Sequence, residues 1–210
     1  MAAGDRTDKI RSKVRLALGM VDSDLPIPVD LDTLVHDTID DYQKRIAEEL
    51  LCIETSANLT ITSGTTSEPA GYFRLKQIVL PTGSTLQVEE VDVSEYDNIT
   101  RITPFPSIQK PIYFKRWAGT WTFYPTPDNG TWSCFYYKVP STNVSTSVDP
   151  ETGTQFDKAI EYGVISDIAP VIRRPDLTDL YTILYTQEMN RLRSAWRRTK
   201  NNNHTIYYNE

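Results

Sequence analysis

The two histidines are the first residues to test for chemistry, because imidazole moves protons and binds zinc near neutral pH. His36 stands in a helical pattern among aspartates, and His204 stands near the C-terminal end. Neither has a second histidine three or four residues away, so the HExxH spacing of a helical zinc site is missing. A GxSxG elbow, which would place a serine beside a histidine, is also missing. We therefore expect His36 to be an exposed helical residue.

The other residue types that carry chemistry form no catalytic motif. Neither GxGxxG nor GxxxxGK[ST] is present to cradle a phosphate. Cys52 and Cys134 lack the CxxC spacing of zinc ribbons and redox dithiols, and the sequence leaves open whether they pair. Neighbouring carboxylates such as Asp22 and Asp24 resemble a glycosidase pair only by abundance, since the chain has 28 acidic residues. We expect no enzymatic activity, no cofactor and no bound metal.

The composition is that of a soluble globular protein, with 39% apolar and 24% charged residues among 210. A net charge of −6 argues against a nucleic-acid-binding surface over the whole molecule, although a local basic patch is compatible with it. No apolar run approaches the roughly 20 residues that span a bilayer, and the first residues lack the apolar core of a signal peptide. We expect a cytoplasmic protein without membrane contact.

Helical patterns at both ends of the chain would have to position any site. Apolar residues recur there at intervals of three and four. Asp30 and Asp176 stand where the N-caps of the second and fourth helices are expected. The pattern predicts helices over residues 6–18, 31–50, 156–168 and 176–200.

Between the second and third helices the pattern changes to the period of two that is typical of strands. The predicted strands are residues 59–62, 73–80, 86–93, 112–117, 120–124 and 131–139. Residues 96–106 are expected to form an irregular loop. Asn129-Gly130 is a strong hairpin signal, so the last three strands are expected to form an antiparallel meander.

The order of these elements predicts an α+β protein in which a helical bundle of about four helices carries an inserted antiparallel, aromatic-rich β domain. Residues 1–51 and 153–200 would form the helical platform, and residues 52–140 the inserted domain. Residues 201–210 would form an extended C-terminal tail.

Aromatic residues crowd into the last strands of the predicted β domain. Strand alternation places aromatic side chains on both faces, so a β core, a flat platform for sugar and an interface with a neighbouring subunit all remain open. The candidates for contact with another subunit or with the tail are Trp117, Trp121, Tyr124, Trp132 and Tyr136.

The C-terminal end of the fourth helix is basic, and a short aromatic-bearing tail follows it. The cations could bind phosphate, but the apolar stripe of the helix and the unanchored tail favour docking to a protein. The residues proposed for this contact are Arg191, Arg193, Arg197, Arg198, Lys200, His204, Ile206, Tyr207 and Tyr208.

Three segments together resemble a known family. Tyr113–Pro127 reads YFKRWAGTWTFYPTP, Trp132–Pro140 reads WSCFYYKVP, and Phe156–Gly163 reads FDKAIEYG. An aromatic strand that ends in Tyr-Pro-x-Pro, a Tyr-Tyr strand and a helix that starts near Phe follow one another. In this order they resemble the head–tail adaptor (connector) proteins of tailed bacteriophages, especially short-tailed ones.

The resemblance implies a structural virion protein without enzymatic activity, located at the head–tail interface. Its subunits would form a ring of about twelve copies. The ring would join the portal protein to a tail or nozzle protein and let DNA pass without sequence-specific binding. The C-terminal segment would contact the portal. A carbohydrate-binding β module on a helical stalk is the alternative, and it requires Trp117, Trp121 and Trp132 to be exposed together.

Overall fold

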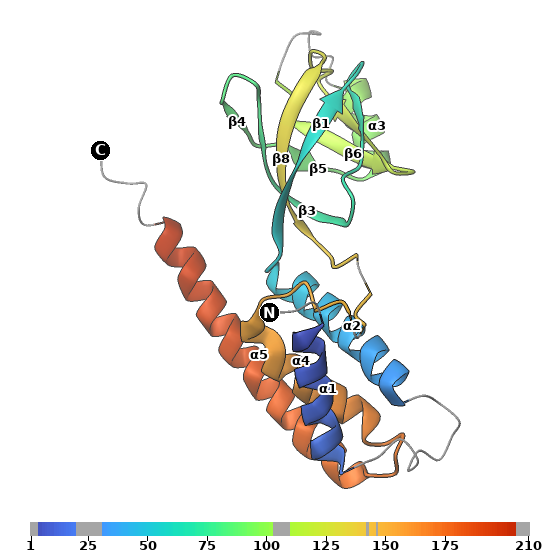
Figure 1. The fold of residues 1–210 in the computed structure, drawn as a ribbon. Helices are drawn as coiled ribbons and strands as arrows, with labels where there is room; N and C mark the ends of the chain where they lie inside the picture. Colours follow the sequence, from blue (N-terminus) through green and yellow to red (C-terminus); the bar gives the residue numbers. More distant parts are fainter. Residues whose placement is uncertain (1–3, 20–30, 103–109, 142, 146, 205–210) are drawn as a thin grey trace. The chain divides into compact units, whose positions relative to one another are not determined.

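The computed structural model describes residues 4–19, 31–102, 110–141, 143–145 and 147–204, with side chains as far as residue 198. The protein is α+β (Figure 1). It divides into two compact units. One, the helical unit, comprises Met1–Cys52 with Pro140–Glu210, and the other, the β unit, comprises Ile53–Val139. Each unit has its own hydrophobic core.

The helical unit is organised around one apolar helix. Its helices are α1 (Asp5–Leu18), α2 (Leu31–Leu50), α4 (Asp157–Ile168) and α5 (Pro175–His204). A 3-10 turn over Thr154–Phe156 leads into α4. Because α4 is buried on most of its circumference, it packs against α1, α2 and α5 together. The four helices lie where the sequence predicts them, but a four-helix bundle is not confirmed.

Small residues let α2 approach α4 closely. Gly163 lies directly against the ring of Tyr42, and a Cβ atom placed on this glycine would stand 2.2 Å from Tyr42 Cε1. On its other side the Tyr42 ring meets Tyr185 of α5 edge to face, with ring centroids 5.1 Å apart. Any side chain at position 163 would therefore have to displace the Tyr42 ring.

Arg6 fastens α1 to the segment that precedes α4. Its guanidinium is buried and donates hydrogen bonds to the carbonyl oxygens of Pro150 (2.8 Å), Thr152 and Gly153 (2.9 Å), and it pairs with Asp157. A guanidinium carries five N–H donors in a planar fork, against three on an ammonium group, so it can serve all four of these acceptors. Arg6 thereby links the first turn of α1 to the backbone of residues 150–153.

Two sheets make up the β unit. One has the strand order β1 (Glu54–Ile61), β8 (Gly130–Lys138), β3 (Tyr72–Val79), β4 (Thr85–Leu86), all antiparallel. The other has the order β2 (Thr65–Ser67), β7 (Thr120–Tyr124), β6 (Tyr113–Trp117), β5 (Glu89–Glu90), with β5 and β6 parallel. The sheets bury part of the predicted aromatic cluster. Phe114, Trp121, Phe123, Trp132 and Tyr136 are core residues, whereas Trp117 is exposed.

The predicted meander is wrong in its third strand. β6 and β7 form the expected hairpin, but β8 lies in the other sheet, between β1 and β3. Pro125 and Pro127, which follow β7, have no N–H groups and cannot continue its ladder. The intervening residues carry the chain to the second sheet, so Asn129-Gly130 starts a strand and does not close a hairpin.

A fifth helix, α3 (Val93–Ile102), replaces part of a predicted strand and of a predicted loop. Asp92 accepts hydrogen bonds from the N–H of Glu95 (2.8 Å) and the hydroxyl of Ser94 (2.6 Å), which starts the helix. These hydrogen bonds, that from Ser94 foremost, lower the pKa of Asp92. Tyr96 is buried beneath α3 and donates its hydroxyl to the carbonyl of Phe123 at 3.1 Å. Among residues 93–102, Tyr96 is the only one that is buried, so α3 lacks the long stripe of core residues that makes α2 predictable.

The ends of α5 also differ from the prediction. The helix begins at Pro175, so Asp176 lies in its first turn and pairs with Arg174 (3.1 Å) in place of capping the helix. At the other end α5 continues to His204, so residues 201–204 are helical and do not belong to an extended tail. No proline or glycine interrupts the helix there. Asp30 and residues 205–210 lie outside the described residues.

Candidate interaction sites

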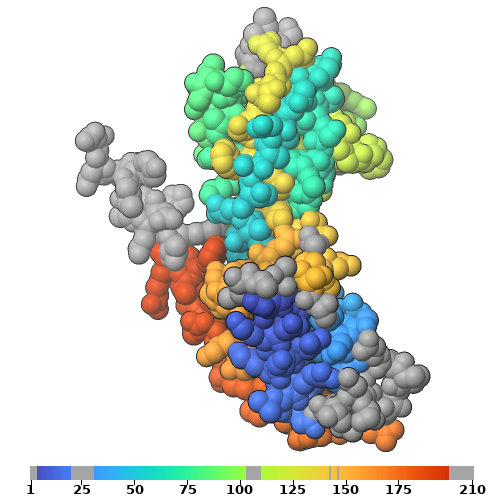
Figure 2. Space-filling view, in the orientation of Figure 1, coloured from blue at the N-terminus to red at the C-terminus, as the bar shows by residue number. Residues whose placement is uncertain are grey.

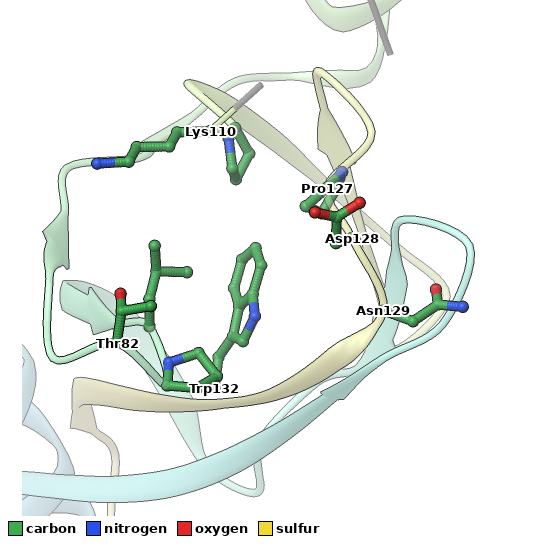
Figure 3. Close-up of a pocket in the computed structure, with 9 residues that line it drawn as sticks. Thr82, Lys110, Pro127, Asp128, Asn129 and Trp132 are labelled. Carbon is green, nitrogen blue, oxygen red and sulfur yellow. The ribbon is translucent and has the colours of Figure 1, made fainter. Parts of the chain in front are cut away.

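A hollow of about 320 Å³ lies at one end of the β unit (Figure 3). It is lined mainly by apolar groups, with the Trp132 indole standing in the middle (Figure 3). Each lining segment comes from a strand end. Leu80–Thr82 follow β3, Pro111 precedes β6, and Pro127 follows β7.

Two charged side chains stand at the rim of the hollow. Lys110 and Asp128 are exposed, and neither has an ion-pair partner among the residues that the structure describes. Asn129 also belongs to the rim, but its amide points away from the hollow (Figure 3) and accepts a hydrogen bond from the N–H of Ser63 at 2.7 Å. The site therefore combines an apolar floor with a cation and a carboxylate that form no ion pair with any described residue.

Among the described residues of the β unit, Trp117 has the most exposed aromatic side chain, with 70% of its surface accessible. It ends β6, next to the turn at Ala118-Gly119. The residue before it is rigidly held: Arg116 binds Glu68 through two hydrogen bonds of 2.8 and 2.9 Å and lies over the ring of Tyr72. The end of β6 thus presents a large apolar side chain to solvent, and a partner that covered it would bury most of that surface.

The other four aromatic candidates do not share this exposure. Trp121, Trp132 and Tyr136 are core residues, with 0, 5 and 5% exposure, and Tyr124 is half-buried with its ring edge-on to Tyr96. Strand alternation alone could not tell core from surface, since both faces carry aromatic residues. The three tryptophans that the sugar platform requires are not exposed together, which removes the support for that alternative.

At the basic end of α5, some of the predicted cations are exposed and others form ion pairs within the protein. Arg191 pairs with Glu188, which lies one turn earlier on the same helix, and Arg193 pairs with Glu49 of α2. Arg197 and Arg198 are exposed, with no ion pair to any described residue. The side chains of Lys200 and His204, and all of Ile206, Tyr207 and Tyr208, lie outside the described part.

A shallow cleft of about 260 Å³ adjoins these cations within the helical unit. Leu50 and Leu51 at the end of α2 face Trp196 and Arg197 of α5 across it. The Trp196 ring meets Phe156 edge to face at 6.4 Å, and its buried indole N–H has no hydrogen-bond partner in the described structure. The cleft therefore offers an apolar wall and, at Arg197, a cation to an incoming segment.

The remaining residues with chemical potential are dispersed. His36 is half-buried on α2. Cys52 and Cys134 are free thiols, and burial raises their pKa values to about 11 and about 12, which keeps both unreactive near neutral pH. Within the described ranges, no three His, Cys, Asp or Glu side chains lie close enough to hold a metal ion. In the same ranges no helix has the length and apolar content needed to cross a bilayer.

The fold is thus α+β. The hollow and Trp117 on the β unit, and the basic end of α5 on the helical unit, are suited to contacts with proteins. The profile of the SU10 adaptor protein family matches residues 7–206, which is nearly the whole chain. The chain belongs to the SU10 adaptor protein family, and the match confirms the resemblance to phage head–tail adaptors. This membership suggests a phage adaptor role of a structural, non-enzymatic kind. Among proteins with curated descriptions, none matches the chain.

Sequence reasoning missed the hollow of the β unit. Its lining comes from three segments that are far apart in the chain, residues 80–82, 110–111 and 127–132, and their meeting depends on the two-sheet topology. Prolines immediately beside predicted strands, as at positions 81 and 111, were the available signal.

Proposed function

We propose that this protein is a structural virion protein, a head–tail adaptor that forms a ring between the portal and the tail. The observation that carries the proposal is the family match over residues 7–206. The ring would contain about twelve subunits, joined by one repeated heterologous interface. Its partners would be the portal protein on one side and a tail or nozzle protein on the other. DNA would pass without sequence-specific binding, and assembly would take place in the host cytoplasm.

The basic end of α5 is the proposed contact with the portal. Arg197 and Arg198 are exposed cations without described partners, and the neighbouring cleft adds the apolar surface of Trp196 and Leu50. A docking segment that combines aromatic and arginine side chains is typical of interface hot spots. The residues after Arg198, including Tyr207 and Tyr208, would extend this contact. The exposed Trp117 supports a separate contact on the β unit.

Electron microscopy of the chain mixed with its cognate portal tests this function. We expect a ring of adaptor density on one face of the portal. Replacing both Arg197 and Arg198 with glutamate should weaken docking at least tenfold, because attraction to the portal surface becomes repulsion. Docking of the unchanged chain should also weaken as salt is raised.

The control is a variant with the same change in charge at exposed cations elsewhere, Lys9→Glu with Arg74→Glu, which should dock normally. Deleting residues 201–210 should also weaken docking. Absence of a ring on the portal would contradict the proposed function. Docking that is unchanged by both the arginine variant and the deletion would refute the assignment of α5.

A further inference from the structure

The β unit carries an exposed tryptophan and an apolar hollow at opposite ends of one hairpin. In the hairpin, Tyr113 pairs with Tyr124 at the open end, and Trp117 pairs with Thr120 at the closed end. Pro111 and Pro127 of the hollow flank the open end. Six residue steps separate Pro111 from Trp117, about 20 Å of extended chain. Trp117 therefore cannot reach the hollow of its own chain.

We infer that Trp117 of one copy inserts into the hollow of a neighbouring copy. The inference rests on the proposed function, because a ring needs two different patches on every subunit, one that inserts and one that receives. Two complementary patches at different places on one surface give a head-to-tail contact, which closes into a ring when the rotation allows. Figure 1 shows the hairpin of β6 and the β3–β4 connection at separate edges of the β unit, so neither patch blocks the other.

The size of the hollow suits a single side chain. At about 320 Å³ it lies at the lower end of the roughly 300–1,000 Å³ range of small-molecule sites. An aromatic side chain is the largest that proteins offer, and it buries roughly 150–250 Å² when fully covered. Of the aromatic residues described in this unit, Trp117 has the most surface left to bury.

The chemistry of the hollow also suits an indole. Proline rings and the Trp132 indole give it apolar walls, against which an aromatic ring packs well. Lys110, free of described ion pairs, can place its ammonium over an inserted ring in a cation–π contact. The Asp128 carboxylate, which is labelled at the rim in Figure 3, can accept a hydrogen bond from the N–H of the inserted Trp117 indole. A second copy of this chain supplies a side chain that uses all three features.

One inserted side chain is an anchor and not a whole interface. A stable interface buries about 1,200–2,000 Å², so the surrounding surface must contribute as well. Anchors of this kind nevertheless dominate binding, and their truncation commonly costs tenfold or more in affinity.

Sedimentation velocity of the full chain between about 1 and 200 µM tests the inference without the portal. We expect concentration-dependent association of the unchanged chain and an association at least tenfold weaker for Trp117→Ala. Thr82→Trp, which fills the hollow from its exposed rim, should weaken association to the same degree. Phe73→Ala removes an aromatic side chain that is 39% exposed elsewhere in the β unit, and it should change association less than twofold.

Mixing the two defective variants gives a sharper result. The Trp117→Ala chain keeps its hollow and the Thr82→Trp chain keeps its inserting tryptophan, so the mixture should form heterodimers that cannot grow further. Near-ultraviolet circular dichroism of each variant checks that the β unit remains folded. The inference would be overturned if Trp117→Ala associated as strongly as the unchanged chain, or if the unchanged chain stayed monomeric throughout the range. A mixture of the two variants that formed no heterodimers would also overturn it. A ring on the portal under those outcomes would leave the adaptor function standing.

Discussion

Gly163 shows how one residue without a side chain sets the packing of three helices. Its Cα faces the Tyr42 ring so closely that any Cβ would need the ring to move, and that ring is itself held by Tyr185. The ring is only 3% exposed, so it has no free space into which to turn.

We expect Gly163→Ala to lower the free energy of unfolding by about 1–3 kcal/mol, the usual cost of overpacking a core. The gain in helix propensity of alanine over glycine, about 1 kcal/mol, offsets part of the steric cost. Urea denaturation followed by circular dichroism would measure the change. In a Tyr42→Leu background the same substitution should cost less, because the clashing ring is gone. An equal cost in both backgrounds would contradict the steric explanation.

At the scale of elements, α3 depends on one buried anchor. Tyr96 packs under the helix, accepts the Lys115 ammonium over its ring at 4.5 Å and donates its hydroxyl to the backbone of β7. Burial, together with the nearby charge of Asp97 and the hydroxyl of Tyr124, raises its pKa to about 12. The neutral phenol is therefore the form that stabilises the helix at ordinary pH.

We expect Tyr96→Ala to release α3 from the sheet, with a loss of about 3 kcal/mol in the stability of the β unit. Hydrogen exchange would show faster exchange of the amides in Val93–Ile102. The amides of β8 would remain the slower ones to exchange. Tyr96→Phe, which keeps the ring, should lose only the hydroxyl contact and about 1 kcal/mol. Unaltered exchange of the α3 amides in Tyr96→Ala would show that the helix is held by other contacts.

The elements also show what periodicity can and cannot predict. The stripe of α2 predicts its core residues Val35, Ile39 and Ile46, because a long one-sided pattern has only one way to be buried. Strand partners are less predictable: β8 is apolar on both faces, and its pattern fits a hairpin with β7 as well as its actual place between β1 and β3. The hollow depends on that placement, so it could not be predicted either. Trp117 could be named as an interface candidate but not distinguished from the buried Trp121.

The molecule as a whole contains two separate cores. One gathers apolar residues of α1, α2, α4 and α5, and the other gathers residues of the two sheets. A unit with its own core and 87 residues between its ends, counted from Ile53 to Val139, is large enough to fold by itself.

We therefore expect an excised fragment of residues 53–139 to unfold cooperatively. Cys134 provides the measurement, because it is fully buried and burial raises its pKa to about 12 from 9.0. Alkylation by iodoacetamide at pH 8 should be roughly a hundredfold slower or more in buffer than in urea. Between about pH 9 and 12 the unfolded thiol loses its proton first, so this residue makes stability fall as the pH rises through that range. Rapid alkylation in buffer at pH 8 would contradict independent folding.

The two ends of the β unit are neighbours in one sheet. β1 and β8 pair in antiparallel register from Glu54 opposite Tyr137, and the Lys138 N–H donates to the Ile53 carbonyl at 3.0 Å. A chain that leaves and returns at adjacent points can accommodate an exchanged module without stretching the scaffold that hosts it. Recombination could thus replace residues 53–139 with another β module whose ends also meet. Such an exchange would alter the partner that the insert recognises, while the helical unit would keep its own partner.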